Sequence, residues 1–346
     1  MNKKNKIEKQ SNIFESFNKT TIIESESHNP WYNLALEEYL LNEVDEKEII
    51  LYLWQNANTV VIGRNQNPWK ECKCKQLERE GGKLARRLSG GGTVYHDLGN
   101  LNYTFIMNSS YYDYNTQMKV ILKAVKNRDI DAKFSGRNDL LVNERKFSGN
   151  AFHVGKVSAL HHGTIMVNTD FEKLVQYLQV SRKKIKAKGI ASVRSRVVNL
   201  NHIKPGLTIT NLKQSLSKCF TKKYGGEDNP DRINPESHNK LKQYYEKYSS
   251  WNWKYGKTPN FDVNLEKRFD WGNIDIGLTA SKGYIDTVKI YSDAMNADLI
   301  EKIEKTIEGI SFDKENIIDN IKNITDKNDQ NPEIFDIIQL INSVDI

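Results

Sequence analysis

The sequence is poor in cysteine and contains no long apolar run. Its three cysteines, Cys72, Cys74 and Cys219, are an odd number in a chain of 346 residues, which argues against a disulfide framework and predicts a reducing compartment. Cys72 and Cys74 have C-x-C spacing without a second cysteine pair, so a structural zinc site is not predicted. No apolar stretch approaches the roughly 20 residues that span a bilayer. We therefore expect a cytoplasmic protein that does not enter a membrane.

The N-terminal segment lacks the features of a targeting peptide. Residues 1–16 contain lysine and glutamate, but neither arginine nor an apolar core. A signal peptide needs such a core, and a transit peptide is rich in arginine and poor in acidic residues. We predict a disordered leader, followed by an ordinary globular chain with 38% hydrophobic and 27% charged residues.

Positive and negative charges are not balanced in the chain, which has an excess of basic residues. Its net charge of +7 and its pI near 9.0 predict affinity for an acidic partner. Residues 181–196 hold seven basic residues and no acidic one, but no aromatic side chain on which a base could stack. A solvated basic loop is an open alternative for this stretch. A nucleic-acid-binding protein is kept only as a distant alternative function.

Strands and helices are mixed along the chain. Residues 49–54 and 59–63 predict two strands that are joined as a hairpin by the turn-like "QNAN" between them. Further strands and helices follow from hydrophobic periodicity and capping residues: strands at 101–107 and 163–168, and helices at 29–44 and after the capping residue Thr169. No regular βαβ rhythm is present. The pattern favours an α+β fold with a largely antiparallel sheet over a doubly wound parallel one.

A polar stretch with glycine and proline, residues 248–261, predicts a domain boundary. Beyond it, two or three strands joined by a Lys282–Gly283 turn precede a helical tail. The predicted organisation is a leader, a large domain, a linker and a small α+β domain: 1–16, 17–250, 251–262 and 263–346.

The stretch "RRLSGGGTVYHDLGN", residues 86–100, combines three consecutive glycines, which have no side chain, with several charged residues. Because glycine has no Cβ, the three glycines let a ligand approach the main-chain N–H groups, as a phosphate group requires. A tight hairpin turn is the alternative interpretation of the glycines alone.

Three more segments mix glycine with polar residues. "GRNDLL" supplies Asn138 and Asp139, and Asp139 is a candidate ligand for the magnesium that accompanies ATP. "RKFSGNAFH" places Lys146 before a serine–glycine pair, and "HHGTIMVN" places His161 and His162 at the start of a strand. A turn, a solvated lysine and a pair of core or capping histidines are the open alternatives.

In their order along the chain, these motifs resemble those of the lipoate–protein ligase family. The resemblance runs from about Trp31 to Val198 and resumes at "SSWNWKYGKTPNF" and the small domain after it. It implies the α+β catalytic fold shared by biotin and lipoate ligases, with a small accessory domain. It also implies that lipoate and ATP, with Mg²⁺, give lipoyl-adenylate, and that the lipoyl group then passes to a lysine of an acceptor protein. The implied acceptors are lipoyl-domain proteins, namely 2-oxoacid dehydrogenase E2 subunits and the glycine cleavage H protein.

The resemblance also implies roles for particular residues. Lys146 would bridge the lipoate carbonyl oxygen and the α-phosphate, which makes it the expected catalytic residue. Arg87 would contact lipoate and the nucleotide, and Asp139 would be the magnesium ligand. The remaining expected binding residues are Ser89, Gly90, Gly91, Gly92, Thr93, Val94, Tyr95, His96, Asn138, Gly149, Ala151 and His162. The apolar tail of lipoate would lie against "LYLW" and "VVIG".

Two further predictions depend on this resemblance. A lipoyl or octanoyl transferase is the nearest alternative, but its chemistry needs a cysteine nucleophile in the site, and none of the three cysteines lies in a motif that would place it there. We expect the ligase to be a monomer. A longer polar leader before Phe17 falls outside the resemblance.

Overall fold

The computed structural model describes residues 17–135, 138–178, 195–233, 239–255, 263–281, 283–324 and 331–343. The predicted leader and most of the basic stretch 181–196 lie outside the described residues. The chain divides into two compact units that interleave in sequence. The first unit contains Met1–Val61, Cys72–Ala85 and Val94–Ser250, and the second contains Ile62–Glu71, Arg86–Thr93 and Trp251–Ile346.

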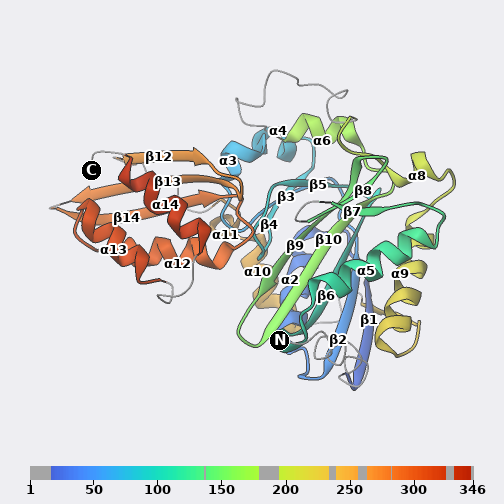
Figure 1. Ribbon diagram of the computed structural model, residues 1–346. Coiled ribbons are helices and arrows are strands. Elements are labelled where there is room, and N and C mark those ends of the chain that lie inside the picture. Colours follow the sequence, from blue (N-terminus) through green and yellow to red (C-terminus); the bar gives the residue numbers. More distant parts are fainter. Residues whose placement is uncertain are drawn as a thin grey trace. The chain divides into compact units, whose positions relative to one another are not determined.

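An eight-stranded sheet forms the centre of the first unit (Figure 1). Its strand order is β11-β1-β2-β6-β10-β9-β8-β7, and the pairs from β2 to β7 are antiparallel, whereas β1 is parallel to both of its neighbours. The strands are β1 (Lys19–Ser25), β2 (Glu48–Trp54), β6 (Asn100–Asn108), β7 (Lys133–Ser135), β8 (Asp139–Val142), β9 (Arg145–Val154), β10 (Ser158–Met166) and β11 (Asp231–Ile233). The prediction of a largely antiparallel sheet is confirmed.

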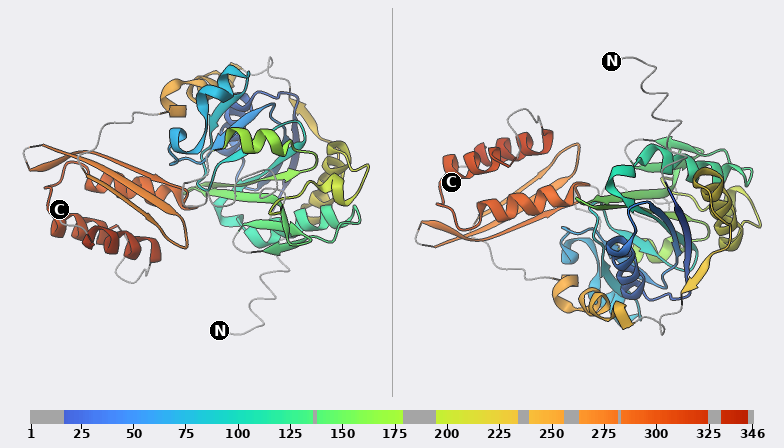
Figure 2. Two further views of the ribbon diagram at one scale, coloured as in Figure 1. Left: turned by 90° about the horizontal axis from the view of Figure 1, so that it is seen from above. Right: turned by 90° about the horizontal axis from the view of Figure 1, so that it is seen from below.

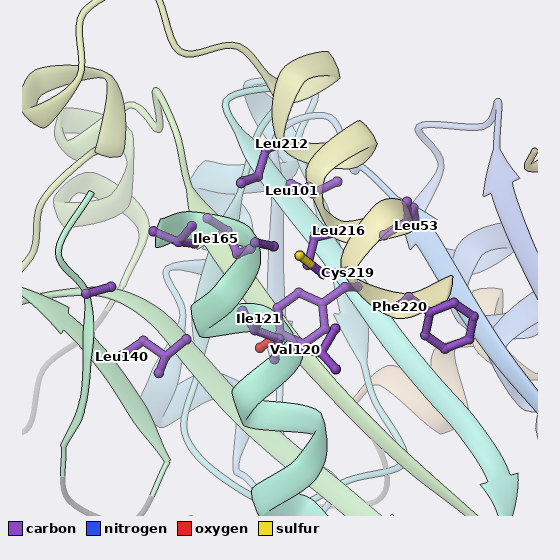
Figure 3. Packing of buried hydrophobic residues seen from close by; sticks show 14 of the residues in the cluster. Leu53, Leu101, Val120, Ile121, Leu140, Ile165, Leu212, Leu216, Cys219 and Phe220 are labelled. Carbon is purple, nitrogen blue, oxygen red and sulfur yellow. The ribbon is translucent and has the colours of Figure 1, made fainter. Parts of the chain in front are cut away.

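Two helices pack together over one face of this sheet (Figures 1 and 2). They are α5 (Tyr114–Lys126) and α9 (Ile209–Tyr224), and both bury an apolar side. Figure 3 shows the resulting core, in which Ile121 of α5 and Leu216 of α9 lie with Leu53 and Leu101 of the sheet. Burying a side chain of this size contributes roughly 1.5–3 kcal/mol.

The predicted helix at 29–44 is present as α2 (Pro30–Glu43), with Pro30 at its start. The side chain of Asn29 accepts a hydrogen bond from the Trp31 N–H and caps the helix. α2 packs against α10 (Lys242–Ser249). Its contacts with β6 and β10 place it against the same sheet.

The predicted hairpin of 49–54 with 59–63 is wrong. The first run is β2, which pairs with β1 and β6, whereas the second is β3 (Thr59–Ile62) in a separate small sheet of order β4-β3-β5. Its neighbours are β4 (Lys83–Arg86) and β5 (Val94–His96). Local turn signals suggested the hairpin, but both runs are buried throughout and find longer-range partners.

Thr169 is not the cap of the helix that follows it. The N-cap of α6 (Phe171–Tyr177) is Asp170, whose carboxylate accepts from the N–H groups of Glu172 and Lys173. A carboxylate reaches both of these donors, while the Thr169 N–H donates to Asn199. Among its described residues, this unit also contains the short α-helices α4 (Cys74–Arg79) and α8 (Leu200–Ile203).

The second unit contains an antiparallel sheet with helices on one face (Figures 1 and 2). The strands are β12 (Val263–Arg268), β13 (Asn273–Ser281) and β14 (Tyr284–Ser292), and the helices are α12 (Ala297–Ile307), α13 (Lys314–Lys322) and α14 (Pro332–Asn342). Isoleucines from all three helices join one core with the sheet. The predicted strands and helical tail are confirmed.

Part of the predicted linker is helical. Residues 251–255 form α11 (Trp251–Tyr255), and residues 256–262 lie outside the described residues. The unit also includes α3 (Pro68–Glu71). Across the described part of the chain, no helix is both long and apolar enough to cross a membrane.

Candidate active site

The glycine loop, residues 87–93, belongs to the second unit. Its backbone runs so close to the chain after β14 that a Cβ at Gly90 would overlap the carbonyl oxygens of Ala294 and Met295. The Gly91 N–H donates to the same Ala294 oxygen at 3.0 Å, with Gly91 at φ +86°. Glycine is therefore required here by backbone packing as well as by conformation.

Arg87 shapes this loop from inside. Its Nη2 donates to the carbonyl oxygens of Gly90 at 2.8 Å and Gly92 at 2.7 Å, and its Nε donates to Ser89 Oγ at 3.1 Å. Arg87 is only 6% exposed, and Ser89 is fully buried. The guanidinium thus holds the carbonyl groups of Gly90 and Gly92 together, and it places a positive charge beside the glycine loop.

Arg86, the other member of the arginine pair, joins separate backbone segments through hydrogen bonds. The sequence did not reveal this structural role. The Arg86 guanidinium donates to the carbonyl oxygens of Arg64 and Gln66, and to those of Trp253 and Lys254 in α11, at 2.7–2.8 Å. Trp253 returns a hydrogen bond from Nε1 to the Arg86 carbonyl. Burial lowers the pKa of Arg86 to about 10, so the group remains charged at neutral pH. Three separated chain segments of the second unit therefore meet at one side chain.

The remaining residues of the motif have ordinary polar or sheet contacts. Thr93 donates to Gln66 Oε1 at 2.9 Å within the second unit. In the first unit, Val94, Tyr95 and His96 form β5 and pair with β3. His96 is buried, with Nδ1 at 3.2 Å from the side-chain nitrogen of Asn56.

Lys146 and Asp139 lie together on adjacent strands of the first unit. Lys146 Nζ is 2.8 Å from Asp139 Oδ1, and each side chain is about one-third exposed, at 34% and 35%. The Lys146 main chain also bonds to the Arg196 carbonyl and the Val198 N–H, at the described end of the basic stretch. The structure thus brings three predicted residues together, since Asn138 immediately precedes Asp139.

Gly149 provides the space that the Lys146 side chain occupies. A Cβ at Gly149 would lie 2.9 Å from Lys146 Nζ and 3.0 Å from its Cε. Gly149 also pairs with Asp139 across the two strands. Only glycine at this position leaves the ammonium group where the ion pair holds it.

We predict that Gly149→Ala displaces Lys146 without unfolding the protein. The overlapping atoms are the end of a flexible side chain, which can move, so we expect a melting temperature within a few degrees of the wild type. The sequence resemblance implies that Lys146 is catalytic, and displacing a reacting group by about 1 Å costs up to 10²-fold in rate. On that expectation, the rate of acceptor lipoylation should fall about 10-fold to 10²-fold, and an unchanged rate would contradict the packing argument.

The adjacent residues His161 and His162 point to opposite faces of β10, because side chains alternate along a strand. His161 is fully buried beneath α5, with Nδ1 at 3.0 Å from Gln117 Oε1 and its ring beside Tyr114. His161 is therefore a core histidine, which was one of the alternatives that the sequence left open. The two rings cannot bind one ion together.

His162 lies on the α2 face in a buried polar cluster. Its Nδ1 is 2.9 Å from Glu37 Oε1, and Thr104 Oγ1 donates to the same oxygen at 2.7 Å. Trp54 Nε1 in turn donates to Thr104 Oγ1 at 3.1 Å, and Glu37 is fully buried. Ala151 pairs directly with His162 across β9 and β10. Sequence reasoning missed Glu37, although an acidic residue within the apolar run "LALEEYLL" was a usable signal.

Burial gives His161 a testable effect on acid stability. It lowers the pKa of His161 to about 3, from an ordinary value of 6.5, and His162 adds to the effect. Below pH 6.5 the unfolded chain therefore binds a proton that the folded protein does not bind until about pH 3. Stability present above pH 6.5 is lost as the pH falls, by up to about 1.4 kcal/mol per pH unit.

Replacing His161 with glutamine should remove that part of the pH dependence. Urea unfolding of both proteins between pH 4 and pH 7 would measure it. We expect the wild-type free energy of unfolding to fall more steeply with acid than that of the variant, and parallel slopes would show that His161 is not the responsible group.

The comparisons with known proteins agree on one family. Residues 29–221 match the family model of the lipoyl protein ligase A/B catalytic domain, and residues 258–341 match that of the bacterial lipoate protein ligase C-terminus. The lipoate-protein ligase A of Blochmanniella floridana is 42% identical over 295 residues, which are 83% of this chain and 88% of that protein.

Solved structures show the same relationship. The crystal structure of P. falciparum LipL1 in complex with lipoate is 34% identical, with a TM-score of 0.82, and covers 94% of this chain and 100% of that one. A crystal structure of lipoate-protein ligase A bound with ATP is 25% identical, with a TM-score of 0.57, and covers 69% of this chain and 99% of that one. The α+β fold with its small second sheet, the motifs and these matches together establish that the chain belongs to the lipoate–protein ligase family and is a ligase.

Proposed function

We propose that this lipoate–protein ligase works in two steps through Lys146. In the first, a lipoate carboxylate oxygen attacks the α-phosphorus of ATP, and the bond to the β-phosphate breaks to release pyrophosphate. In the second, the ε-amine of an acceptor lysine attacks the lipoyl carbonyl carbon, loses a proton, and AMP leaves. The ATP-bound and lipoate-bound relatives support these substrates.

The observation that carries the proposal is the Lys146–Asp139 pair at 2.8 Å. Both steps develop negative charge on a carbonyl or phosphoryl oxygen, and a fixed cation stabilises such charge. Lys146 is partly exposed, so its ammonium group is accessible to a substrate. The ion pair and the space over Gly149 hold the ammonium group in one place before substrate binds.

We propose that the glycine loop and β5 bind the adenylate. Arg87 supplies positive charge, and the main chain of Gly92, Thr93, Val94 and Tyr95 supplies hydrogen-bonding groups. Ser89 supports Arg87 through the hydrogen bond described above. His96 and Asn138 are proposed as supporting polar residues, and the apolar tail of lipoate is proposed to lie against residues 51–54 near His162.

Asp139 is the proposed protein ligand for Mg²⁺. A single carboxylate fits this ion, which takes most of its ligands from ATP phosphate oxygens and water. Among the described residues, no group of three or more acidic, histidine or cysteine side chains forms a self-sufficient metal site. When bound with ATP, the ion would neutralise phosphate charge.

The acceptors are proposed to be lipoyl-domain proteins, such as 2-oxoacid dehydrogenase E2 subunits and the glycine cleavage H protein. The excess positive charge of the chain would speed the encounter with an acidic acceptor surface. We assign catalysis to a domain spanning 17–250 and an accessory role to 263–346, with 251–262 as the linker. The cysteines do not favour a transferase, since Cys72, Cys74 and Cys219 are at most 7% exposed.

The test is mass spectrometry of an apo lipoyl domain after incubation with the protein, lipoate, ATP and magnesium. One added lipoyl group that requires ATP supports the ligase. Modification only when lipoyl-adenylate is supplied would identify a transferase without the activation step, and no modification in either case would refute the proposal.

A further inference from the structure

A buried polar network connects the core of the first unit to the strand that carries Lys146. Tyr103, Gly163 and Asn150 lie opposite one another on β6, β10 and β9. The Tyr103 hydroxyl donates to Asn150 Oδ1, and His161 Nε2 is 2.9 Å from the same oxygen. Asn150 is 4% exposed, so its amide group is fixed within the sheet rather than solvated.

The other end of the Asn150 side-chain amide holds Asn138, the residue immediately before β8. Asn150 Nδ2 donates to the Asn138 carbonyl at 3.0 Å, and the Asn150 main-chain N–H donates to the same oxygen at 3.0 Å. Asn138 Nδ2 returns a hydrogen bond to the Asn150 carbonyl at 2.8 Å. The two asparagines are thus joined in both directions, through side chain and main chain.

Gly163 is required for this arrangement. A Cβ there would overlap both the Tyr103 hydroxyl and Asn150 Oδ1. The missing side chain leaves the space in which the two groups meet, between strands that are otherwise closely packed. The network is therefore built into the strand sequence and does not depend on surface side chains.

We propose that Asn150 is a positioning residue that fixes Asn138, and with it the start of β8 at Asp139, for catalysis. Asp139 follows the anchored Asn138 directly and pairs with Lys146. A strand end held at the Asn138 carbonyl from the buried core keeps the carboxylate, and through it the ammonium group, in register with the strand that bears Lys146. This inference rests on the proposed function of Lys146.

Asn150→Ala tests the proposal, with Tyr103→Phe as the matched control. Both variants remove a hydrogen bond from the same buried amide group, but only the first removes the side-chain donor to the Asn138 carbonyl, which then keeps only the main-chain N–H of residue 150. Hydrogen exchange on the unliganded proteins should show faster exchange at the main-chain N–H of residue 150 and at residues 139–142 in Asn150→Ala alone. In lipoate-dependent pyrophosphate exchange, we expect about a 10-fold lower kcat for Asn150→Ala and a KM for lipoate within twofold of wild type.

Asn150→Asp provides a second variant if the alanine protein does not fold. It keeps the shape and the oxygen that faces Tyr103 and His161, but it replaces the donor to the Asn138 carbonyl with an acceptor. The same selective loss of kcat is expected. Kinetics and exchange equal to those of Tyr103→Phe would overturn the positioning role, whereas a wild-type protein without ligation would overturn the proposed function instead.

Discussion

Replacing Lys146 with alanine is expected to abolish lipoylation of an acceptor domain, with both half-reactions slowed by about 10³-fold or more. Removing one positioned donor from a site that stabilises an oxyanion costs about 10²–10³-fold, and a cation that meets phosphoryl charge is worth 10³–10⁵-fold. Lys146 is proposed to do both. Pyrophosphate exchange measures the first step, and transfer from supplied lipoyl-adenylate measures the second.

Lys133→Ala is the matched control for that experiment. Lys133 lies two strands away in the same sheet, is 59% exposed and pairs with Glu144. Exposed pairs of this kind contribute at most about 1 kcal/mol to stability, so the variant should fold and ligate like the wild type. If Lys146→Ala kept activity close to that of the control, Lys146 would have no direct role in either step.

Replacing Arg86 with alanine is expected to lower the free energy of unfolding of the second unit by about 3–5 kcal/mol. The substitution leaves buried main-chain carbonyls without their charged donor, and each unsatisfied polar group costs about 1–3 kcal/mol. It also releases α11 from the segment at 62–71. Calorimetry or urea unfolding would report the loss as an earlier or separate transition.

Arg268→Ala serves as the comparison for Arg86. Arg268 is 53% exposed and bonds to Asp293 at 2.7 Å in the same unit, so its removal should cost no more than about 1 kcal/mol. Arg86→Lys should behave more like alanine, because one ammonium group cannot reach the carbonyls that Nε, Nη1 and Nη2 bind at different edges of the planar guanidinium. Equal, small decreases in the free energy of unfolding for Arg86→Ala and Arg268→Ala would show that the buried Arg86 hydrogen bonds do not stabilise the unit.

Patterns along the sequence predicted part of the set of elements. The helix at 29–44, the strands β2 and β6, the end of β10 and the helical tail were predicted, whereas β1, β7, β8, β9 and β11 of the large sheet were not. Strand pairing was less predictable: β2 finds its partners in β1 and β6 instead of β3, because pairing is decided by burial across the whole sheet. The α6 cap likewise moved one residue, from Thr169 to Asp170.

The residues of the candidate site were likewise predicted only in part. The stretch "GRNDLL" pointed to Asp139, and the motif around Lys146 pointed to Gly149; the structure places both beside the ammonium group. Glu37 and Asn150 were not found, because their importance depends on contacts with strands more than 10 residues away in sequence. The sequence suggested a role for Arg87 and none for Arg86, whose function follows only from its contacts with carbonyls of distant chain segments.

The interleaving of the two units has a consequence for protein synthesis. Residues 62–71 and 86–93 leave the ribosome early, but the rest of their unit begins at Trp251. The main-chain partners of Gly90 and Gly91 at Ala294 are made later still. The loop proposed to bind ATP therefore cannot reach its final packing until the chain has been translated past Ala294, and we expect the nascent protein to acquire activity only after its C-terminal sheet is complete.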